Sequence, residues 1–333
     1  MRHREPKRPP LSRGSGRPGQ RGAALLLAMI ILALVTTLAA GMVWQQARAV
    51  QVEAAERARA QAAWVLTGAL DWARLILRED LRAAQRRGPL YTSLGDSWAT
   101  PLEEARLSSF LAADQDNNVD SGPEAFISGA IVDAQSRYNL RNLVDGTGRI
   151  VPAQLAGLQR LAQAAGAPGS AADEIAQALA RAFAPAGARA DPQAPLKPER
   201  VADLRWLGVD GATLAQLRPF VTLLPAVTPV NANTAPAEVL LAAVDGLDLG
   251  SAQRLVQARR RNPYTTPAAV QALLPQGATL DPTRLGVFSA WFEVSGRLRL
   301  DGRVLEQRSL LQRDLGRVTV RRTERRSFAT PAR

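Results

Sequence analysis

One uninterrupted apolar run stands near the start of the chain. From Ala23 to Trp44, 22 consecutive residues carry no charge. A helix rises about 1.5 Å per residue, so this run reaches about 33 Å, enough to cross the hydrocarbon core of a bilayer. Apolar residues continue at helical spacing until Gly88-Pro89. The pattern predicts one long N-terminal helix over 23–88, whose membrane part is 23–44.

The period of the pattern changes twice later in the chain. Residues 89–128 are rich in loop residues, and the β-branched run after them predicts a strand at about Ser128–Asp133. Residues 291–314 alternate, and predict a hairpin with a type I′ turn at Asp301-Gly302. The sequence between them is alanine-rich at helical spacing. The helices predicted there are Pro152–Ala165, Ala171–Phe183, Pro198–Leu207, Ala212–Leu223, Ala235–Val244, Gly250–Arg261 and Pro267–Leu274.

Strands on both sides of a helical segment predict an α+β fold. Residues 89–150 together with 286–315 form one predicted α/β domain, interrupted by an all-helical insertion over 151–285. The proline- and glycine-rich stretch 184–198 is predicted to be a linker or flexible loop. The arginine-rich tail, 316–333, is predicted to be disordered.

The net charge is concentrated at the two ends of the chain. Its formal value is +12, which by itself favours an anionic partner such as nucleic acid or lipid. Residues 1–22 carry seven basic residues against one acidic, and residues 313–333 carry seven against two, so a net charge of +1 is left between them. A nearly neutral body argues against nucleic-acid binding as the main role.

The basic leader, residues 1–22, does not fit a cleaved secretory signal. Such a signal has its apolar region before the cleavage site, whereas here the leader ends at Gly22 and the apolar run follows it. Two interpretations stay open, an uncleaved signal anchor or cleavage after Gly22 on the cytoplasmic face. The positive-inside rule predicts a single-pass protein, with the N-terminus in the cytoplasm and the globular part across the membrane.

A basic leader ending in glycine, an apolar N-terminal helix and a C-terminal globular part resemble the type IV pilins and pseudopilins. The resemblance implies that prepilin peptidase cleaves between Gly22 and Ala23, and that the new N-terminus is methylated. These subunits normally carry glutamate at the fifth mature position, where this chain has Leu27. That glutamate pairs with the N-terminal amine of a neighbouring subunit, so a chain with leucine there fits at the tip of the filament.

Among pseudopilins, the missing glutamate resembles minor pseudopilin K, the GspK family of the type II secretion system. Two further stretches, IVDAQSRYNLRNL and NANTAPAEVL, also resemble that family. The resemblance implies a pseudopilin α/β fold with a helical insertion, a single span of the inner membrane and a periplasmic globular part. The implied partners are other minor pseudopilins of the same system, prepilin peptidase and the inner membrane, with no nucleic acid.

The composition removes most catalytic and metal chemistry. Cysteine is absent and the single histidine, His3, lies in the leader, which excludes thiolate nucleophiles, histidine-based triads and nearly all zinc sites. No phosphate-binding loop, dinucleotide fingerprint, hydrolase motif or metalloprotease motif occurs. We therefore expect no enzymatic activity and no cofactor.

Trp64 and Trp72 are expected to pack the long helix onto the globular part.

One acidic loop has the spacing of a calcium site. The oxygens of Asp114, Asp116, Asn118 and Asp120 could ligate Ca²⁺, but Val119 and Ala125 depart from the calcium-loop pattern. A solvated polar loop is the favoured interpretation, and calcium binding stays open.

Residues 229–260 resemble a helix-hairpin-helix module, which binds DNA phosphates through a glycine hairpin. The hairpin here is longer than usual and carries Asp245 and Asp248 where the phosphate would lie. Packing is therefore the favoured role, and a membrane-anchored DNA-binding protein for uptake stays the alternative.

The function we predict is a non-enzymatic minor pseudopilin at the tip of the type II secretion pseudopilus, which initiates its assembly for export of folded proteins.

Overall fold

The structure is a computed structural model of the 333-residue chain. It describes residues 20–107, 125–185, 195–300, 303–314 and 316–329. The chain forms two compact units, residues 1–61 and 62–333.

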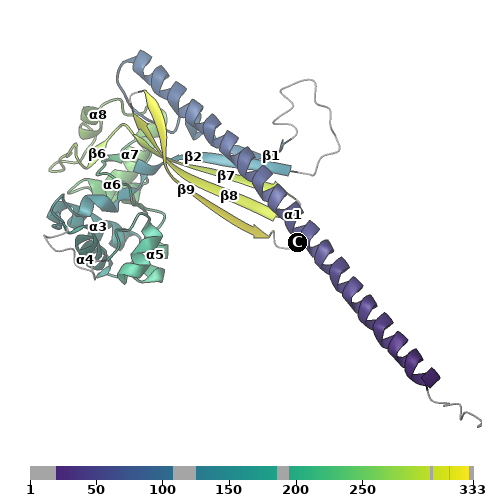
Figure 1. The fold of residues 1–333 in the computed structure, drawn as a ribbon. Coiled ribbons are helices and arrows are strands. Elements are labelled where there is room, and N and C mark those ends of the chain that lie inside the picture. The colour runs from purple at the N-terminus through teal and green to yellow at the C-terminus, as the bar shows by residue number, and fades with distance from the viewer. Residues whose placement is uncertain (1–19, 108–124, 186–194, 301–302, 315, 330–333) are drawn as a thin grey trace, which may run out of the picture. The chain divides into compact units, whose positions relative to one another are not determined.

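The first unit contains the N-terminal part of helix α1, which runs from Gln20 to Arg87 (Figure 1). The single long helix predicted from the sequence is therefore confirmed. Its side chains are exposed from Ala23 to Ala54. A stretch of 18 residues within it reaches a mean hydropathy of 2.6 with none of its residues buried, so by length and composition it can cross a membrane.

The two hydroxyls of the apolar run are satisfied inside the helix. Thr36 Oγ1 donates to the carbonyls of Leu32 and Ala33, and Thr37 Oγ1 to those of Ala33 and Leu34, each at 2.9 Å. A hydroxyl that bonds to its own helix needs no partner from water. The run therefore suits a hydrocarbon environment despite these two polar residues.

The second unit is built on one five-stranded antiparallel sheet, ordered β1-β2-β7-β8-β9 (Figure 1). The strands come from two distant parts of the chain, as the sequence pattern indicates. Their bounds are Leu102–Arg106 for β1, Ala125–Asp133 for β2, Trp291–Leu300 for β7, Arg303–Asp314 for β8 and Arg317–Ala329 for β9. Strand β1 lies in a stretch for which the sequence predicts loops. The pairing of β7 with β8 up to Leu300↔Arg303 confirms the predicted hairpin, whereas residues 301–302, predicted as its type I′ turn, lie outside the described residues.

The C-terminal part of α1 packs across this sheet with one apolar stripe. Its buried residues recur every three or four positions, and are Ala62, Leu66, Leu70, Ala73, Leu77, Leu81 and Ala84. Leu66 meets Ile127 and Leu298 of the sheet, and Leu77 lies in a cluster with Phe292. Burying one leucine side chain contributes about 1.5–3 kcal/mol, so the stripe fixes this part of the helix on the sheet.

The other helices of the second unit gather at one end of the sheet (Figure 1). Their residues lie between β2 and β7 in the sequence, and we call this segment, 152–271, the helical block. It contains α3 (Pro152–Ala164), α4 (Ala171–Phe183), the 3-10 helix η4 (Val201–Leu207), α5 (Gly211–Leu217), α6 (Ala237–Ala243), α7 (Leu249–Arg261) and α8 (Pro267–Gln271). Three short 3-10 turns lie elsewhere: η1 (Ser97–Ala99), η2 (Ala134–Ser136) and η3 (Leu140–Leu143).

The segment predicted as an all-helical insertion also contains short strands, which corrects that prediction. Strand β4 (Val221–Thr222) pairs in parallel with β3 (Tyr138–Asn139), and β5 (Val230–Asn231) pairs in parallel with β6 (Leu285–Gly286). The helix predicted over Ala212–Leu223 ends at Leu217, because Pro219 has no backbone N–H to continue the helical hydrogen bonds. Of the predicted loop 184–198, residues 186–194 lie outside the described residues.

Strand β9 overturns the prediction that the tail, 316–333, is disordered. It pairs with β8 from Asp314↔Arg317 to Arg303↔Ala329. The arginines do not prevent a strand, because they lie on exposed or half-buried positions while Val318 is buried. Charged side chains on an edge strand also oppose pairing with other chains. Residues 330–333 lie outside the described residues.

Candidate assembly helix and buried polar junction

The three residues singled out for processing and assembly lie on one continuous helix. Gly22, Ala23 and Leu27 all fall within α1. The side chain of Leu27 is 61% exposed, and the other large apolar residues up to Trp44 are similarly exposed. Because no charge occurs along this run, the helix is apolar on every side. Such a surface needs lipid or other apolar helices around it.

A cation–π contact marks the end of the apolar run. The guanidinium of Arg48 lies 5.5 Å from the centroid of the Trp44 ring, one helical turn away. Tryptophan and arginine both stabilise helices at the membrane–water interface. The pair Arg57–Glu53, at 2.5 Å, follows on the exposed surface of the helix. These contacts place the change from an apolar to a charged helix surface directly after Trp44.

A largely apolar groove of about 290 Å³ lies between α1 and the sheet. Leu70 and Ile76 line it from the helix, and Ile131 and Val294 line it from strands β2 and β7. Trp72 lies on the lining and is 57% exposed. The groove therefore offers an aromatic and aliphatic contact surface on the globular unit.

The prediction that Trp64 and Trp72 pack the helix onto the globular part is wrong. Trp64 is 77% exposed and Trp72 is 57% exposed. Both fall off the buried stripe of α1, since Ala62, Leu66 and Ala73 flank them on a different face. The helical period of the sequence was enough to predict that both tryptophans lie off the buried stripe. Two exposed tryptophans are candidates for contact with another chain.

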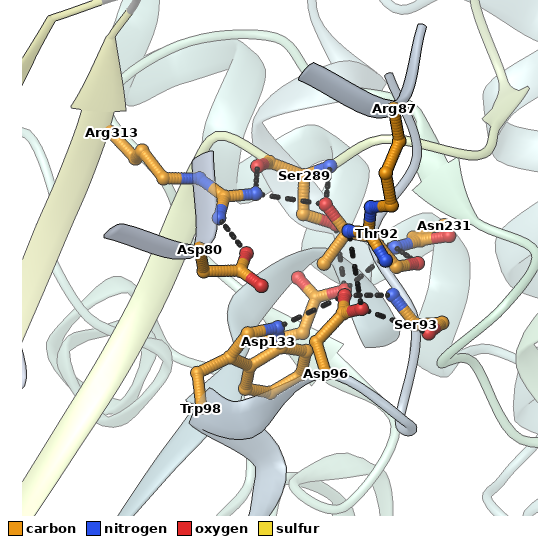
Figure 2. A network of polar contacts seen from close by, with 10 residues as sticks. All are labelled: Asp80, Arg87, Thr92, Ser93, Asp96, Trp98, Asp133, Asn231, Ser289 and Arg313. Atoms are coloured by element: carbon orange, nitrogen blue, oxygen red, sulfur yellow. Dashed lines mark hydrogen bonds and ion pairs between the residues drawn. The ribbon is translucent and has the colours of Figure 1, made fainter. Parts of the chain in front are cut away.

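A buried carboxylate, that of Asp133, lies where the end of β2 meets the helical block (Figure 2). Its Oδ2 accepts from Asn231 Nδ2 at 3.0 Å, Ser289 Oγ at 2.6 Å and Thr234 Oγ1 at 2.5 Å. Its Oδ1 accepts from the backbone N–H of Gln135 at 2.8 Å. One side chain thus accepts four hydrogen bonds from three segments of the chain.

Arg313 of β8 lies beside this carboxylate and is almost fully buried (Figure 2). Its Nη1 donates to Asp80 Oδ2 at 2.7 Å, and its Nη2 donates to Thr92 Oγ1 at 2.8 Å and to the Ser289 carbonyl at 3.0 Å. The guanidinium also lies 4.6 Å from the centroid of the Phe292 ring. Because Asp80 is on α1, this arginine joins the long helix directly to the sheet.

The loop that follows α1 completes the network. Asp96 Oδ2 accepts from the backbone N–H of Ser93 at 2.7 Å and from Trp98 Nε1 at 3.3 Å. Arg87, the last residue of α1, approaches Asp96 to 3.9 Å. Figure 2 shows these side chains converging on the same buried region as Arg313 and Asp133. We call the ten residues drawn there the polar junction: Asp80, Arg87, Thr92, Ser93, Asp96, Trp98, Asp133, Asn231, Ser289 and Arg313.

Burial shifts the pKa of three groups in the polar junction, Asp133, Asp80 and Arg313. It raises the pKa of Asp133, against the opposing effect of its hydrogen bonds. It also raises the pKa of Asp80, an effect that the charge of Asp96 strengthens and Arg313 opposes. Burial lowers the pKa of Arg313, and the carboxylates around it, Asp80 first, act in the opposite direction. The charges are therefore costly to bury and stabilise one another only in this arrangement.

The polar junction was not predicted from the sequence. Its members come from α1, the following loop, β2, the helical block, the connection before β7, and β8, so no local spacing brings them together. The available signal was polar residues at the ends of apolar runs, such as Asp133 after AIV and Asn231 after PV. Its chemistry is structural, since it holds the end of α1, the sheet and the helical block in one arrangement.

The hairpin between α6 and α7 uses its aspartates within the protein. Asp245 accepts from Arg160 and Arg284, each at 2.6 Å, and these contacts lower its pKa, the hydrogen bond from Arg284 most. Asp248 caps α7 by accepting from the backbone N–H and the hydroxyl of Ser251. Two carboxylates at this position oppose a phosphate, so the geometry favours packing over DNA binding.

The candidate calcium ligands Asp114, Asp116, Asn118 and Asp120 lie outside the described residues. Within the part of the chain that the structure describes, histidine and carboxylate side chains form no cluster of three or more that could hold a metal ion.

The chain is similar to proteins of one secretion system. Two family models described as type II secretion system protein K match residues 136–226 and 230–287. Type II secretion system protein K of Pectobacterium carotovorum subsp. carotovorum is 31% identical over 329 residues, covering 89% of this chain and 93% of that protein. Its counterpart from Pseudomonas aeruginosa is 29% identical, covering 89% and 90%.

A solved structure shares the fold. It is the crystal structure of the GspK-GspI-GspJ complex from enterotoxigenic Escherichia coli. The similarity has a TM-score of 0.58 at 20% sequence identity, and covers 82% of this chain and 98% of the matched one.

Proposed function

This chain belongs to the type II secretion system protein K family, and from that premise we propose that it is a non-enzymatic minor pseudopilin at the tip of the pseudopilus. There it initiates assembly of the filament that exports folded proteins across the outer membrane. The observation that carries the proposal is Leu27 on an exposed helix surface that is uncharged from Ala23 to Trp44.

The mechanism follows from the cost of an unpaired charge among apolar helices. A subunit that joins below another presents a carboxylate to the N-terminal amine of the subunit above it. Leu27 provides no carboxylate, so this chain does not join below an existing subunit. It has a place at the start of the filament, where no earlier amine needs a partner.

The proposed topology places the apolar helix in the inner membrane as a single span. The leader is cytoplasmic and is removed by prepilin peptidase between Gly22 and Ala23, after which the new N-terminus is methylated. Residues from Trp44 onward lie in the periplasm. The pair Trp44–Arg48, at 5.5 Å, supports an interface at that level.

The proposed partners are other minor pseudopilins of the same system. The solved relative is a complex with GspI and GspJ. The polar junction supports such a role, because it fixes the end of α1 to the sheet and the helical block. We propose further that residues 89–150 with 286–315 form the pseudopilin domain. Residues 151–285 form an insertion that blocks the addition of another subunit above this chain.

A pair of glutamate substitutions tests the tip proposal. In cells that assemble pseudopili, Leu27→Glu is expected to leave filament initiation unchanged or slightly reduced, because no subunit amine lies above it. Leu26→Glu, the matched control, adds the same charge one position away. More filaments per cell with Leu27→Glu than with the wild-type chain would contradict the proposal.

A further inference from the structure

An arginine-rich cleft of about 440 Å³ lies between the helical block and the sheet. Residues of η4, α5 and β4 line one wall, and residues of β7, β8 and β9 line the other. The apolar part of its lining includes Leu214, Leu223 and Leu310, each less than 9% exposed. The cleft therefore combines charged walls with an apolar lining.

The charge of the cleft comes from both walls. Arg200, Arg205 and Arg218 line it from the helical block. Arg308, Arg322 and Arg326 line it from β8 and β9, and Arg137 is a seventh arginine. The acidic residues on the lining are Glu293 and Glu324.

Four of these arginines have a carboxylate partner, and one of the carboxylates, Glu324, is shared by Arg322 and Arg200, which lies 3.4 Å from it. Arg137 pairs with Glu293 at 2.6 Å, and Arg200 pairs with Asp203 at 2.7 Å. The other two pairs are Arg308–Glu306 at 2.5 Å and Arg322–Glu324 at 3.2 Å.

Three arginines are left without a full counter-charge. Arg326 lies 4.0 Å from Glu324, which Arg322 already holds more closely. Arg205 and Arg218 have no ion-pair partner among the residues that the structure describes, and both are exposed. Cations that face one another across a cleft repel, and an anionic ligand between them relieves that repulsion.

We propose that this cleft binds an extended, acidic peptide segment of a partner protein. Arginine is suited to this ligand because its planar guanidinium bonds a carboxylate through two parallel N–H groups. The apolar residues on the lining give the small or apolar side chains between the carboxylates a surface to contact.

A nucleic acid fits the same cleft less well. None of the residues that line it in the described structure is aromatic, so bases have no stacking platform. Glu293 and Glu324 also oppose an unbroken line of phosphates, whereas a peptide can place neutral residues beside them.

The test is a binding measurement with the full-length chain in detergent micelles. The probe is a labelled peptide of alternating glutamate and alanine, followed by fluorescence anisotropy at low salt. A peptide of alternating glutamine and alanine controls for backbone and micelle binding. The glutamate peptide is expected to bind more tightly, with an affinity that falls as salt is raised.

Paired charge reversals locate the binding. Arg205→Glu with Arg218→Glu is expected to weaken binding of the glutamate peptide by at least about tenfold. Arg260→Glu with Arg261→Glu makes the same change of net charge on exposed residues of α7. This control is expected to change the affinity for the glutamate peptide by less than about twofold. Arg205→Gln with Arg218→Gln, each variant checked by circular dichroism, gives the same direction of effect with a smaller perturbation.

Three results would overturn the proposal. One is equal weakening by the cleft and control reversals, which would mean that net charge alone attracts the peptide. Another is equal affinity for the glutamate and glutamine peptides. The third is tighter binding of single-stranded DNA than of the peptide, together with loss of that DNA binding in the cleft reversals. This result would assign the cleft to nucleic acid.

Discussion

Arg313 Nη1 lies 2.7 Å from Asp80 Oδ2, across 233 positions of sequence and at the centre of a buried region. One residue comes from the long helix and the other from strand β8. This ion pair therefore links α1 directly to the sheet. Its removal tests whether the polar junction fixes the helix on the globular unit.

Arg313→Met is expected to destabilise the fold by about 3–5 kcal/mol, because it leaves the buried Asp80 carboxylate without its partner. Asp80→Leu alone should be similarly harmful, since it leaves Arg313 unpaired. The double variant should be less destabilised than the sum of the single variants. Urea unfolding of the wild type, the two single variants and the double variant gives the coupling free energy between the two side chains. Additive effects of the single variants would mean that the two side chains do not stabilise one another.

Asp133 is expected to make stability depend on pH in a defined direction. Burial raises its folded-state pKa above the ordinary value near 4. Between these two values the folded protein binds more protons than the unfolded chain, so the contribution of this group is greatest below about pH 4 and falls as pH rises. Asparagine does not titrate, so the penalty of Asp133→Asn in the free energy of unfolding should be larger at pH 4 than at pH 7.

Asp145 provides a control of opposite sign. Hydrogen bonds, that from Thr147 first, lower its pKa in the folded state. Its contribution is therefore present above the ordinary value and lost as pH falls through the folded pKa. Asp145→Asn should cost more at pH 7 than at acid pH. If the two asparagine variants showed the same pH trend, the assignment of a raised pKa to Asp133 would be wrong.

Gly296 is expected to resist substitution because α1 approaches the sheet closely there. A Cβ at this position would lie 3.0 Å from Leu66 Cδ2. Gly296→Val should destabilise by about 1–3 kcal/mol through overpacking, and Leu66→Ala should cost less in the Gly296→Val chain than in the wild-type chain. Gly146→Ala is the control, since a Cβ there meets nothing within 4 Å. Thermal unfolding compares the variants, and an unchanged Tm for Gly296→Val would mean that the helix lies further from the sheet.

Trp64 and Trp72 are expected to matter for assembly more than for stability, since both are more than half exposed. Trp64→Ala with Trp72→Ala should leave the unfolding midpoint within about 2 °C and reduce co-purification with other minor pseudopilins. Trp206→Ala removes a tryptophan of 58% exposure from the helical block and serves as the matched control. Loss of co-purification with Trp206→Ala alone would move the interface to the helical block.

The local elements of this fold were largely predictable from the sequence, and the contacts between them were not. The three-to-four spacing of apolar residues predicts α1 to within a few residues, because a helix needs only its own period to be recognised. The strand β9 was missed because its arginines suggested disorder, although Val318 and the edge position allow a charged strand. The polar junction was missed because residues as distant as Asp80 and Arg313 meet only after the sheet has formed.

The most direct measurement of the central claim is the position of this chain in assembled pseudopili. A gold label bound to a tag on its globular part, viewed by electron microscopy, reports that position. We predict one label at one end of each filament and none along the shaft. Labels repeated along the shaft would contradict the tip assignment.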